Sequence, residues 1–346
     1  MLPYLILLFF VTMLLSIGAL FKEVRRYTFF STIVILIFFS GFAKGVGFDY
    51  FNYLELFDLI RLKYSVPLEY GYVVLIKTII FFGGKYQLLV FVSSLLTNLL
   101  IGYFIYKNSP NPNLSLFIYV VLSIYYLATF TTIRQFIAVG LFAASLKLIS
   151  EKRFWLYTLL MLIGSSVHVT LILLWPLYFV LRRKFKLYHY AIAFLLYTIG
   201  TNLITIVFKD ILGYAHYFVK TDNSSNNMVL IAFGLIGMVL IFYKDRLFKV
   251  SAHAAIYINL IFFSILVITT IYISPIPSEI ALRMSTYFNL SYLIIIPLFL
   301  KTIKNTNLRY LYLSVILSLF VSYFLYIIVN GAKYNLIPYT LDFNLF

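Results

Sequence analysis

Long apolar runs alternate along the chain with short breaks that are polar and mostly basic. The first run covers residues 3–21 and the second residues 28–44, and a turn carrying Lys22, Arg25 and Arg26 separates them. Runs of about 17–25 apolar residues match the hydrocarbon thickness of a bilayer. Because the bilayer core offers no water to the backbone, such runs cross it as helices. The pattern therefore predicts an all-α, polytopic transmembrane helical bundle.

The same pattern continues through the rest of the chain. Further spans are expected at residues 86–106, 114–130, 133–149, 154–166, 168–181, 188–208, 229–243, 253–273, 284–300 and 308–329. Residues 67–83 are apolar but carry Lys77 at mid-segment, which predicts a re-entrant or interfacial helix. The first basic turn is then expected on the cytoplasmic side of the membrane, as the positive-inside rule requires. Four further basic loops are expected on that same side: SEKR, RRKFK, KDRLFK and KTIKNTNLR. We expect about 12 spans in a single integral-membrane domain, residues 1–346, with both termini outside.

Composition supports this interpretation and narrows the chemistry. Hydrophobic residues make up 63% and charged residues 11%, whereas a soluble domain carries roughly 25% charged residues. The net charge of +16 is explained by the cytoplasmic loops, so we do not expect nucleic-acid binding. The absence of cysteine excludes disulfides and thiolate metal sites. No His pair has the spacing of a metal site, and neither a metal nor another cofactor is expected.

Polar residues gather in the segments that this topology places outside: residues 45–83, 209–228, 274–283 and 331–346. Polar groups near one face of a helical bundle suggest an aqueous cavity that opens outward. The sequence has no obvious internal repeat, which argues against a transporter built from inverted repeats.

Two arginines in these outer regions are candidate anion ligands. Arg134 follows Thr131 in TTIRQ, where Thr131 could cap a helix, and a guanidinium at a helix N-terminus suits a phosphate. Gln135 adds further donors. The alternative for Arg134 is a side chain that extends to lipid headgroups. Arg283 could complete a pyrophosphate clamp, or it could form a helical ion pair with Glu279, four residues earlier.

The candidate acid–base groups are His168 and Asp49. His168 follows an expected break at residues 164–166 and could act as a general base or hydrogen-bond a sugar or phosphate, although a lone His is commonly structural. Asp49 lies in GVGFDY and could hydrogen-bond or deprotonate a sugar hydroxyl. Glu69 could bind a sugar, or simply stabilise the helix that it precedes. Tyrosines of outer segments could stack on sugar rings or belong to the core and the interfacial belt: Tyr50, Tyr287 and Tyr339.

Six short motifs, in order over residues 45–340, resemble one known family. They are GFDYxxY, EYGY, IRQFIAV, SSVHVTLI, RMSTYF and a terminal IPY. The chain resembles the EpsG-type polysaccharide polymerases, relatives of the Wzy polymerases of O-antigen and capsule. In this resemblance Arg134 and His168 match family positions, and Asp49, Arg283 and Tyr339 match more loosely.

The resemblance implies a GT-C-like glycosyltransferase of the bacterial inner (cytoplasmic) membrane, active on its periplasmic or extracellular face. Its substrates would be oligosaccharide repeat units linked to undecaprenyl pyrophosphate, and its other partners membrane lipids and a chain-length regulator. The sequence has no DxD motif, so a metal-bound nucleotide donor is not indicated. Two alternatives remain open at this point: a flippase or transporter of lipid-linked sugars, and an outer-leaflet glycan ligase.

Overall fold

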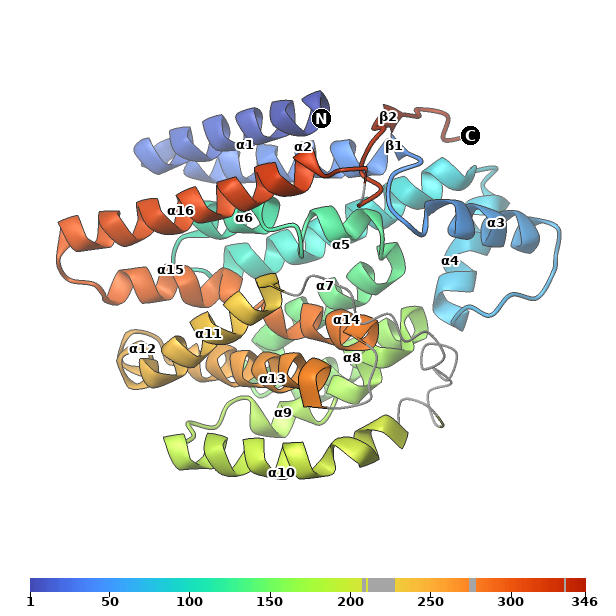
Figure 1. Cartoon of the computed structure of the whole chain (residues 1–346). Helices are drawn as coiled ribbons and strands as arrows, with labels where there is room; N and C mark the ends of the chain where they lie inside the picture. The colour runs from blue at the N-terminus through green and yellow to red at the C-terminus, as the bar shows by residue number, and fades with distance from the viewer. Residues whose placement is uncertain (207–209, 211–227, 274–277, 333) are drawn as a thin grey trace. The chain divides into compact units, whose positions relative to one another are not determined.

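The computed structural model describes residues 1–206, 210, 228–273, 278–332 and 334–346, with the side chains of 202–205, 228, 229, 271–273, 278 and 279 left out. Of the expected outer segments, most of 209–228 and the first four residues of 274–283 therefore lie outside the described residues. The described chain is helical apart from a pair of two-residue strands. It forms two compact units, residues 1–175 with 303–346 and residues 176–302, whose helices are labelled in Figure 1.

The first unit contains most of the long helices. They are α1 (Leu2–Leu20), α2 (Arg25–Gly41), α3 (Tyr50–Arg61), α4 (Tyr70–Phe81), α5 (Tyr86–Asn108), α6 (Pro112–Val121), α7 (Ile133–Ser150), α8 (Phe154–Val167) and α16 (Thr306–Val329). Short 3-10 helices lie at Lys22–Val24, Leu127–Phe130 and Val169–Leu174, and strands β1 (Ala43–Lys44) and β2 (Thr340–Leu341) pair antiparallel. Helix α5 packs against both α2 and α7, and α7 packs against α8.

The second unit consists of α9 (Leu177–Val180), α10 (Leu187–Ile206), α11 (Met228–Phe242), α12 (Lys244–Val250), α13 (Ala254–Ile273), α14 (Ser278–Asn289) and α15 (Tyr292–Thr302). Helix α13 packs against α14 and α11. Asn259 of α13 is fully buried, donates to the carbonyls of Leu181 and Arg183 at 2.9 Å each, and accepts from the Tyr190 hydroxyl at 2.6 Å. This amide satisfies backbone groups that an apolar environment would otherwise leave unpaired.

The described helices agree with the expected helical membrane protein, and the number of about 12 spans stays a prediction. Five described helices are long and apolar enough to cross a bilayer: α1, residues 22–41, α5, α7 and α16. A sixth is obtained if α14 and α15, which meet at 43°, form one bent span. The expected interfacial segment 67–83 contains a separate short helix, α4. The expected span 168–181 is a 3-10 helix followed by the single turn of α9.

The expected helix break at residues 164–166 is wrong, because α8 continues through it to Val167. The hydroxyls of Ser165 and Ser166 donate to carbonyls three residues earlier, at 2.9 and 2.7 Å, so they are satisfied inside the helix. Gly164 makes room for a neighbour: a Cβ there would lie 2.1 Å from a methyl carbon of Leu171. The small residues therefore serve close packing, and the chain changes direction at His168.

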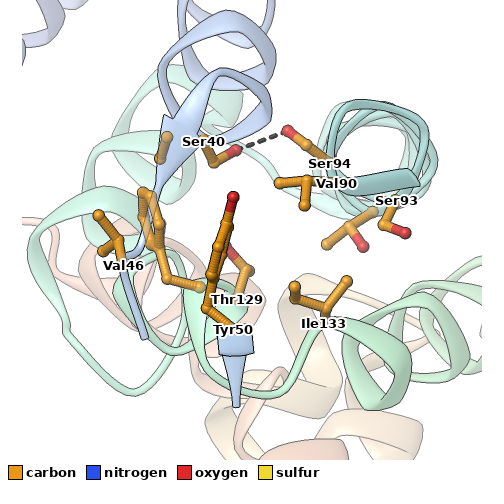
Figure 2. Close-up of a pocket in the computed structure, with 11 residues that line it drawn as sticks. Ser40, Val46, Tyr50, Val90, Ser93, Ser94, Thr129 and Ile133 are labelled. Carbon is orange, nitrogen blue, oxygen red and sulfur yellow. Dashed lines mark hydrogen bonds between the residues drawn. The ribbon is translucent and has the colours of Figure 1, made fainter. Parts of the chain in front are cut away.

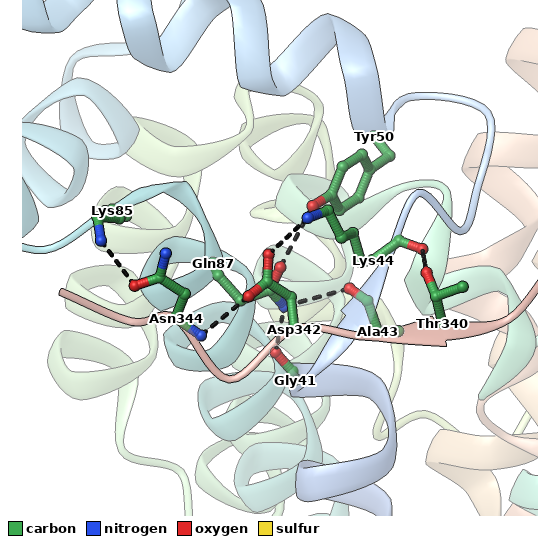
Figure 3. A network of polar contacts seen from close by, with 9 residues as sticks. All are labelled: Gly41, Ala43, Lys44, Tyr50, Lys85, Gln87, Thr340, Asp342 and Asn344. Atoms are coloured by element: carbon green, nitrogen blue, oxygen red, sulfur yellow. Dashed lines mark hydrogen bonds and ion pairs between the residues drawn. The ribbon is translucent and has the colours of Figure 1, made fainter.

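Residues 335–346, which we call the C-terminal strap, lie across the loop between α2 and α3 (Figure 3). The Lys44 ammonium is 3.0 Å from the Asp342 carboxylate, and the Lys85 ammonium donates to the Asn344 side chain at 2.6 Å. Asn335 and Gly47 exchange two hydrogen bonds of 2.7 and 2.8 Å. The strap thus fixes the loop that leads into α3.

Candidate functional site

Helices α7 and α8 form a hairpin whose turn, residues 151–153, is basic (Figure 1). Arg134 is the second residue of α7, and His168 is the first residue after α8. Because the two helices run antiparallel, both residues lie at the same end of the hairpin. Both contact one carboxylate, that of Glu69, and this confirms that they share one end of the bundle.

Glu69 forms the centre of the candidate site. Its Oε2 pairs with the Arg134 guanidinium, while its Oε1 accepts from the Val169 amide at 3.0 Å and lies 3.5 Å from His168 Nδ1. The side chains of Glu69, Arg134 and His168 are only 20%, 16% and 4% exposed. The three groups are therefore largely withdrawn from water. Electrostatic interactions between them are stronger in this environment than they would be in water.

The local sequence explains how Glu69 reaches this position. Glu69 precedes α4 with an extended backbone, at φ −65° and ψ 142°, and a carboxylate at a helix N-terminus is favoured by the helix dipole. The next glycine, Gly71, allows α4 to approach α8, since a Cβ there would lie 2.2 Å from the Ser166 hydroxyl. The EYGY motif thus combines a charged group with the glycine that allows close approach.

Glu69 is ionised throughout the physiological pH range. Burial alone would raise the pKa of its carboxyl, but the hydrogen bond from His168, the charge of Arg134 and the Val169 amide together lower that pKa to about 2. The carboxylate is therefore a permanent negative charge between the arginine and the histidine.

Arg134 keeps hydrogen-bonding capacity beyond its pair with Glu69. Its guanidinium carbon lies 5.9 Å from the centre of the Tyr53 ring, a cation–π distance. Among the described residues its Nε has no hydrogen-bond partner, although the atom is buried. A guanidinium has five N–H donors in a planar fork. Arg134 can therefore hold Glu69 and still donate to a phosphate oxygen.

Thr131 does not cap the helix that carries Arg134, contrary to expectation. The N-cap residue of α7 is Thr132, which makes no capping hydrogen bond because its hydroxyl donates to the Ala128 carbonyl at 3.1 Å. The Thr131 hydroxyl instead accepts from the Phe48 amide at 3.4 Å. The N-terminus of α7 therefore has no side-chain cap, and its first turn carries the guanidinium of Arg134. Gln135, next in sequence, is buried.

A small cavity lies beside this helix start (Figure 2). Its walls carry the hydroxyls of Ser40, Ser93, Ser94, Thr129 and Tyr50, and Ser40 and Ser94 are hydrogen-bonded at 2.6 Å. The volume that the centre of a water molecule can occupy is about 20 Å³, which is enough for about one water molecule. The cavity is too small for a sugar ring, so a glycan would have to reach Arg134 by another route.

The three predicted sugar-stacking tyrosines occupy packed positions. Tyr50 is 5% exposed and donates to Gln87 at 3.2 Å, and Tyr287 of the second unit is fully buried. Tyr339 belongs to the C-terminal strap, where its hydroxyl donates to the Phe39 carbonyl at 2.7 Å and its ring stacks on the Phe39 ring at 4.5 Å. These contacts hold the strap against α2, and a role in sugar binding stays a prediction for all three.

Asp49 and Arg283 do not belong to the contacts described around Glu69. Asp49 is half-exposed at the start of α3, one helical turn before Tyr53. Arg283 is partly exposed on α14 of the second unit, and the side chain of Glu279 lies outside the described residues. The acid–base role of Asp49 and the clamp formed by Arg283 with Arg134 stay predictions. Within the described part of the chain, no group of three His, Asp or Glu side chains could hold a metal.

The sequence did not reveal that Glu69 pairs with Arg134, or that Tyr53 covers the guanidinium. The only signal for this pairing was the position of the EYGY glutamate directly before a short helix, together with the glycine two residues later.

Comparison with known proteins identifies the family to which the chain belongs. No curated protein and no solved structure matches the chain. The model of the EpsG family matches residues 26–341, nearly the whole chain, and this match covers α4, α7 and α8 with the three residues of the site. This membrane protein therefore belongs to the EpsG family, a family of polysaccharide polymerase-like glycosyltransferases.

Proposed function

We propose that this protein polymerises oligosaccharide repeat units carried on undecaprenyl pyrophosphate, at the outer leaflet of the bacterial cytoplasmic membrane. The product would be an O-antigen, capsule or exopolysaccharide. Membership of the EpsG family supports the polymerase class. The observation that carries the proposal is the largely buried cluster of Glu69, Arg134 and His168 at one end of the α7–α8 hairpin.

In this proposal Arg134 binds the pyrophosphate of the donor. A leaving pyrophosphate gains negative charge as its bond to the sugar breaks, and a positioned guanidinium stabilises that charge best where water is scarce. Glu69 keeps the guanidinium in place through one oxygen. The buried Nε, which has no partner among the described residues, would donate to the pyrophosphate when it binds. Arg283 would supply a second cation to the same group.

His168 would act on the acceptor. The Glu69 carboxylate lies on the Nδ1 side of the imidazole, so a proton on Nδ1 leaves Nε2 as the basic nitrogen. The acceptor hydroxyl oxygen attacks the anomeric carbon of the donor and transfers its proton to Nε2. The bond from that carbon to the pyrophosphate oxygen breaks, and the pyrophosphate leaves with the electron pair. Asp49 would hydrogen-bond a hydroxyl of one of the two glycans.

The test is reconstitution of the purified protein in lipid discs with an undecaprenyl-pyrophosphate-linked repeat unit. A ladder of products is expected from a polymerase, one addition to a lipid acceptor from a ligase, and no new product from a flippase. Removing one charge-stabilising donor typically lowers kcat about 10²–10³-fold, so Arg134→Ala should lose the ladder. Arg153→Ala is the matched control, because Arg153 lies on the basic turn at the other end of the hairpin and is 58% exposed. A full ladder from Arg134→Ala would overturn the assignment.

A further inference from the structure

A second concave feature of the first unit lies at the end of the α1–α2 hairpin. It is an open groove of about 1,090 Å³ between the first turns of α1, the last two turns of α2 and the C-terminal strap. Ile6 of α1 and Val34 of α2 both line it, and their side chains are 46% and 50% exposed. Its volume lies slightly above the range for small-molecule pockets, roughly 300–1,000 Å³.

The lining offers nothing to a polar ligand. Only two of the lining side chains, Tyr339 and Thr340, carry a polar group, and both of these hydroxyls already donate a hydrogen bond within the protein. The Tyr339 hydroxyl donates to the Phe39 carbonyl at 2.7 Å, and the Thr340 hydroxyl donates to the Lys44 carbonyl at 3.1 Å. A groove with apolar walls and satisfied hydroxyls favours a hydrocarbon.

The groove is connected to the candidate site through aromatic rings. Phe39 forms part of its wall, and the Phe39 ring meets the Phe130 ring edge-on, at 6.3 Å between centres. Phe130 lines the small hydroxyl cavity together with Ile133, the residue immediately before Arg134. One layer of rings therefore separates the apolar groove from the cavity at the start of α7.

We propose that this groove holds the hydrocarbon chain of the lipid-pyrophosphate donor while Arg134 binds its pyrophosphate, an inference that rests on the proposed function. Since α1 and residues 22–41 are both long and apolar enough to span the bilayer, the groove is open to membrane lipid without passage through water. A long chain held here would add affinity in proportion to the apolar surface that it covers. A donor with a short chain would gain nothing from the groove.

The groove can be tested by filling it. Ile6→Trp and Val34→Trp each add an indole ring on a different wall, which guards against failure of one variant to fold. Met13→Trp is the matched control: Met13 is 39% exposed and lies seven residues after Ile6, on the same side of α1 but outside the groove. All variants are compared after their thermal unfolding in detergent is shown to match that of the unmodified protein.

The first measurement is direct binding of radiolabelled undecaprenyl monophosphate, which requires no catalysis. Both groove variants should raise its Kd about tenfold, equivalent to 1.4 kcal/mol, while Met13→Trp changes it less than about twofold. An excess of unlabelled phosphatidylglycerol should not displace the probe. Unchanged affinity in both groove variants would overturn the proposal. Displacement by the phospholipid would also overturn it, because the groove would then be a general lipid site.

The second measurement separates this proposal from the proposed function. With the lipid-linked repeat unit, the groove variants should raise KM about tenfold for the undecaprenyl donor and leave KM unchanged for a donor on a short isoprenoid. Equal effects on both donors would overturn the groove assignment while the polymerase stands. Groove-dependent binding of the monophosphate without any ladder would support the groove and contradict the polymerase.

Discussion

Replacement of Glu69 by glutamine tests the electrostatic core of the site. Glutamine keeps the shape and a hydrogen-bond acceptor but removes the charge that faces Arg134 and His168. In the unmodified protein the pKa of Glu69 falls from its ordinary 4.5 to about 2. At 1.36 kcal/mol per pKa unit, this difference would equal about 3 kcal/mol of stability. The Glu69 side chain is 20% exposed, so solvent screening lowers the expected contribution to about 1–2 kcal/mol.

The sign of the pH dependence follows from the direction of that pKa change. The unfolded chain takes up the Glu69 proton near pH 4.5, whereas the folded protein stays ionised until about pH 2. The stabilisation is therefore complete above about pH 5 and is lost as the pH falls toward 2. Above pH 5, Glu69→Gln should unfold about 2–6 °C below the unmodified protein, and this gap should narrow as the pH is lowered.

The assay is thermal unfolding in detergent across this pH range. Glu55→Gln is the control, since Glu55 is exposed on α3 and its replacement should change stability by less than about 0.5 kcal/mol. The double variant Glu69→Gln/Arg134→Gln should lose less than the sum of the two single variants, because the two groups interact directly. A gap between Glu69→Gln and the unmodified protein that stays constant from pH 6 to pH 3 would refute this reasoning.

Further predictions concern the loop before α3 and the C-terminal strap. Gly47→Ala should be much more destabilising than Gly83→Ala, as thermal unfolding would measure. Both glycines have positive φ, +92° and +77°, but only at Gly47 would a Cβ lie 2.1 Å from the Phe130 carbonyl oxygen. Strain at positive φ costs about 1–3 kcal/mol, so equal losses at both positions would contradict a steric role for Gly47. Tyr339→Phe should lower stability by about 1 kcal/mol through one lost hydrogen bond and leave polymer length unchanged. Shortened polymer at normal stability would instead support a sugar-binding role for Tyr339.

The pair with Glu69 explains how an arginine can lie at the end of an apolar helix in this protein. A guanidinium at the edge of an apolar helix is costly unless it is paired or has a ligand. Arg134 has a carboxylate on one side and an unpaired Nε among the described residues. The pairing makes the cation tolerable in the absence of ligand, and the remaining donors allow it to bind an anion.

The sequence by itself determined the helical membrane class and the positions of the longest spans. These depend on local hydrophobicity, and α1, α5, α7 and α16 lie within a few residues of the expected runs. It also placed Arg134 and His168 at one end of a helix pair. The basic turn between the two helices is expected on the cytoplasmic side, so both residues are expected at the opposite end. Local sequence could not fix the break near residues 164–166, since serine and glycine are compatible both with a helix and with its end.

Only the tertiary structure decided what these residues contact. Glu69 is 65 residues from Arg134 along the chain, and the two are in contact beside the place where Gly71 allows α4 to approach α8. From the sequence, Tyr339 was a candidate for stacking on a sugar ring. In the structure its ring stacks on that of Phe39, 300 residues away along the chain. Hydrophobic periodicity reports which residues enter the membrane, but it carries no information about which distant helix each polar group will face. That choice depends on close packing between helices, and in this protein it determines the candidate site.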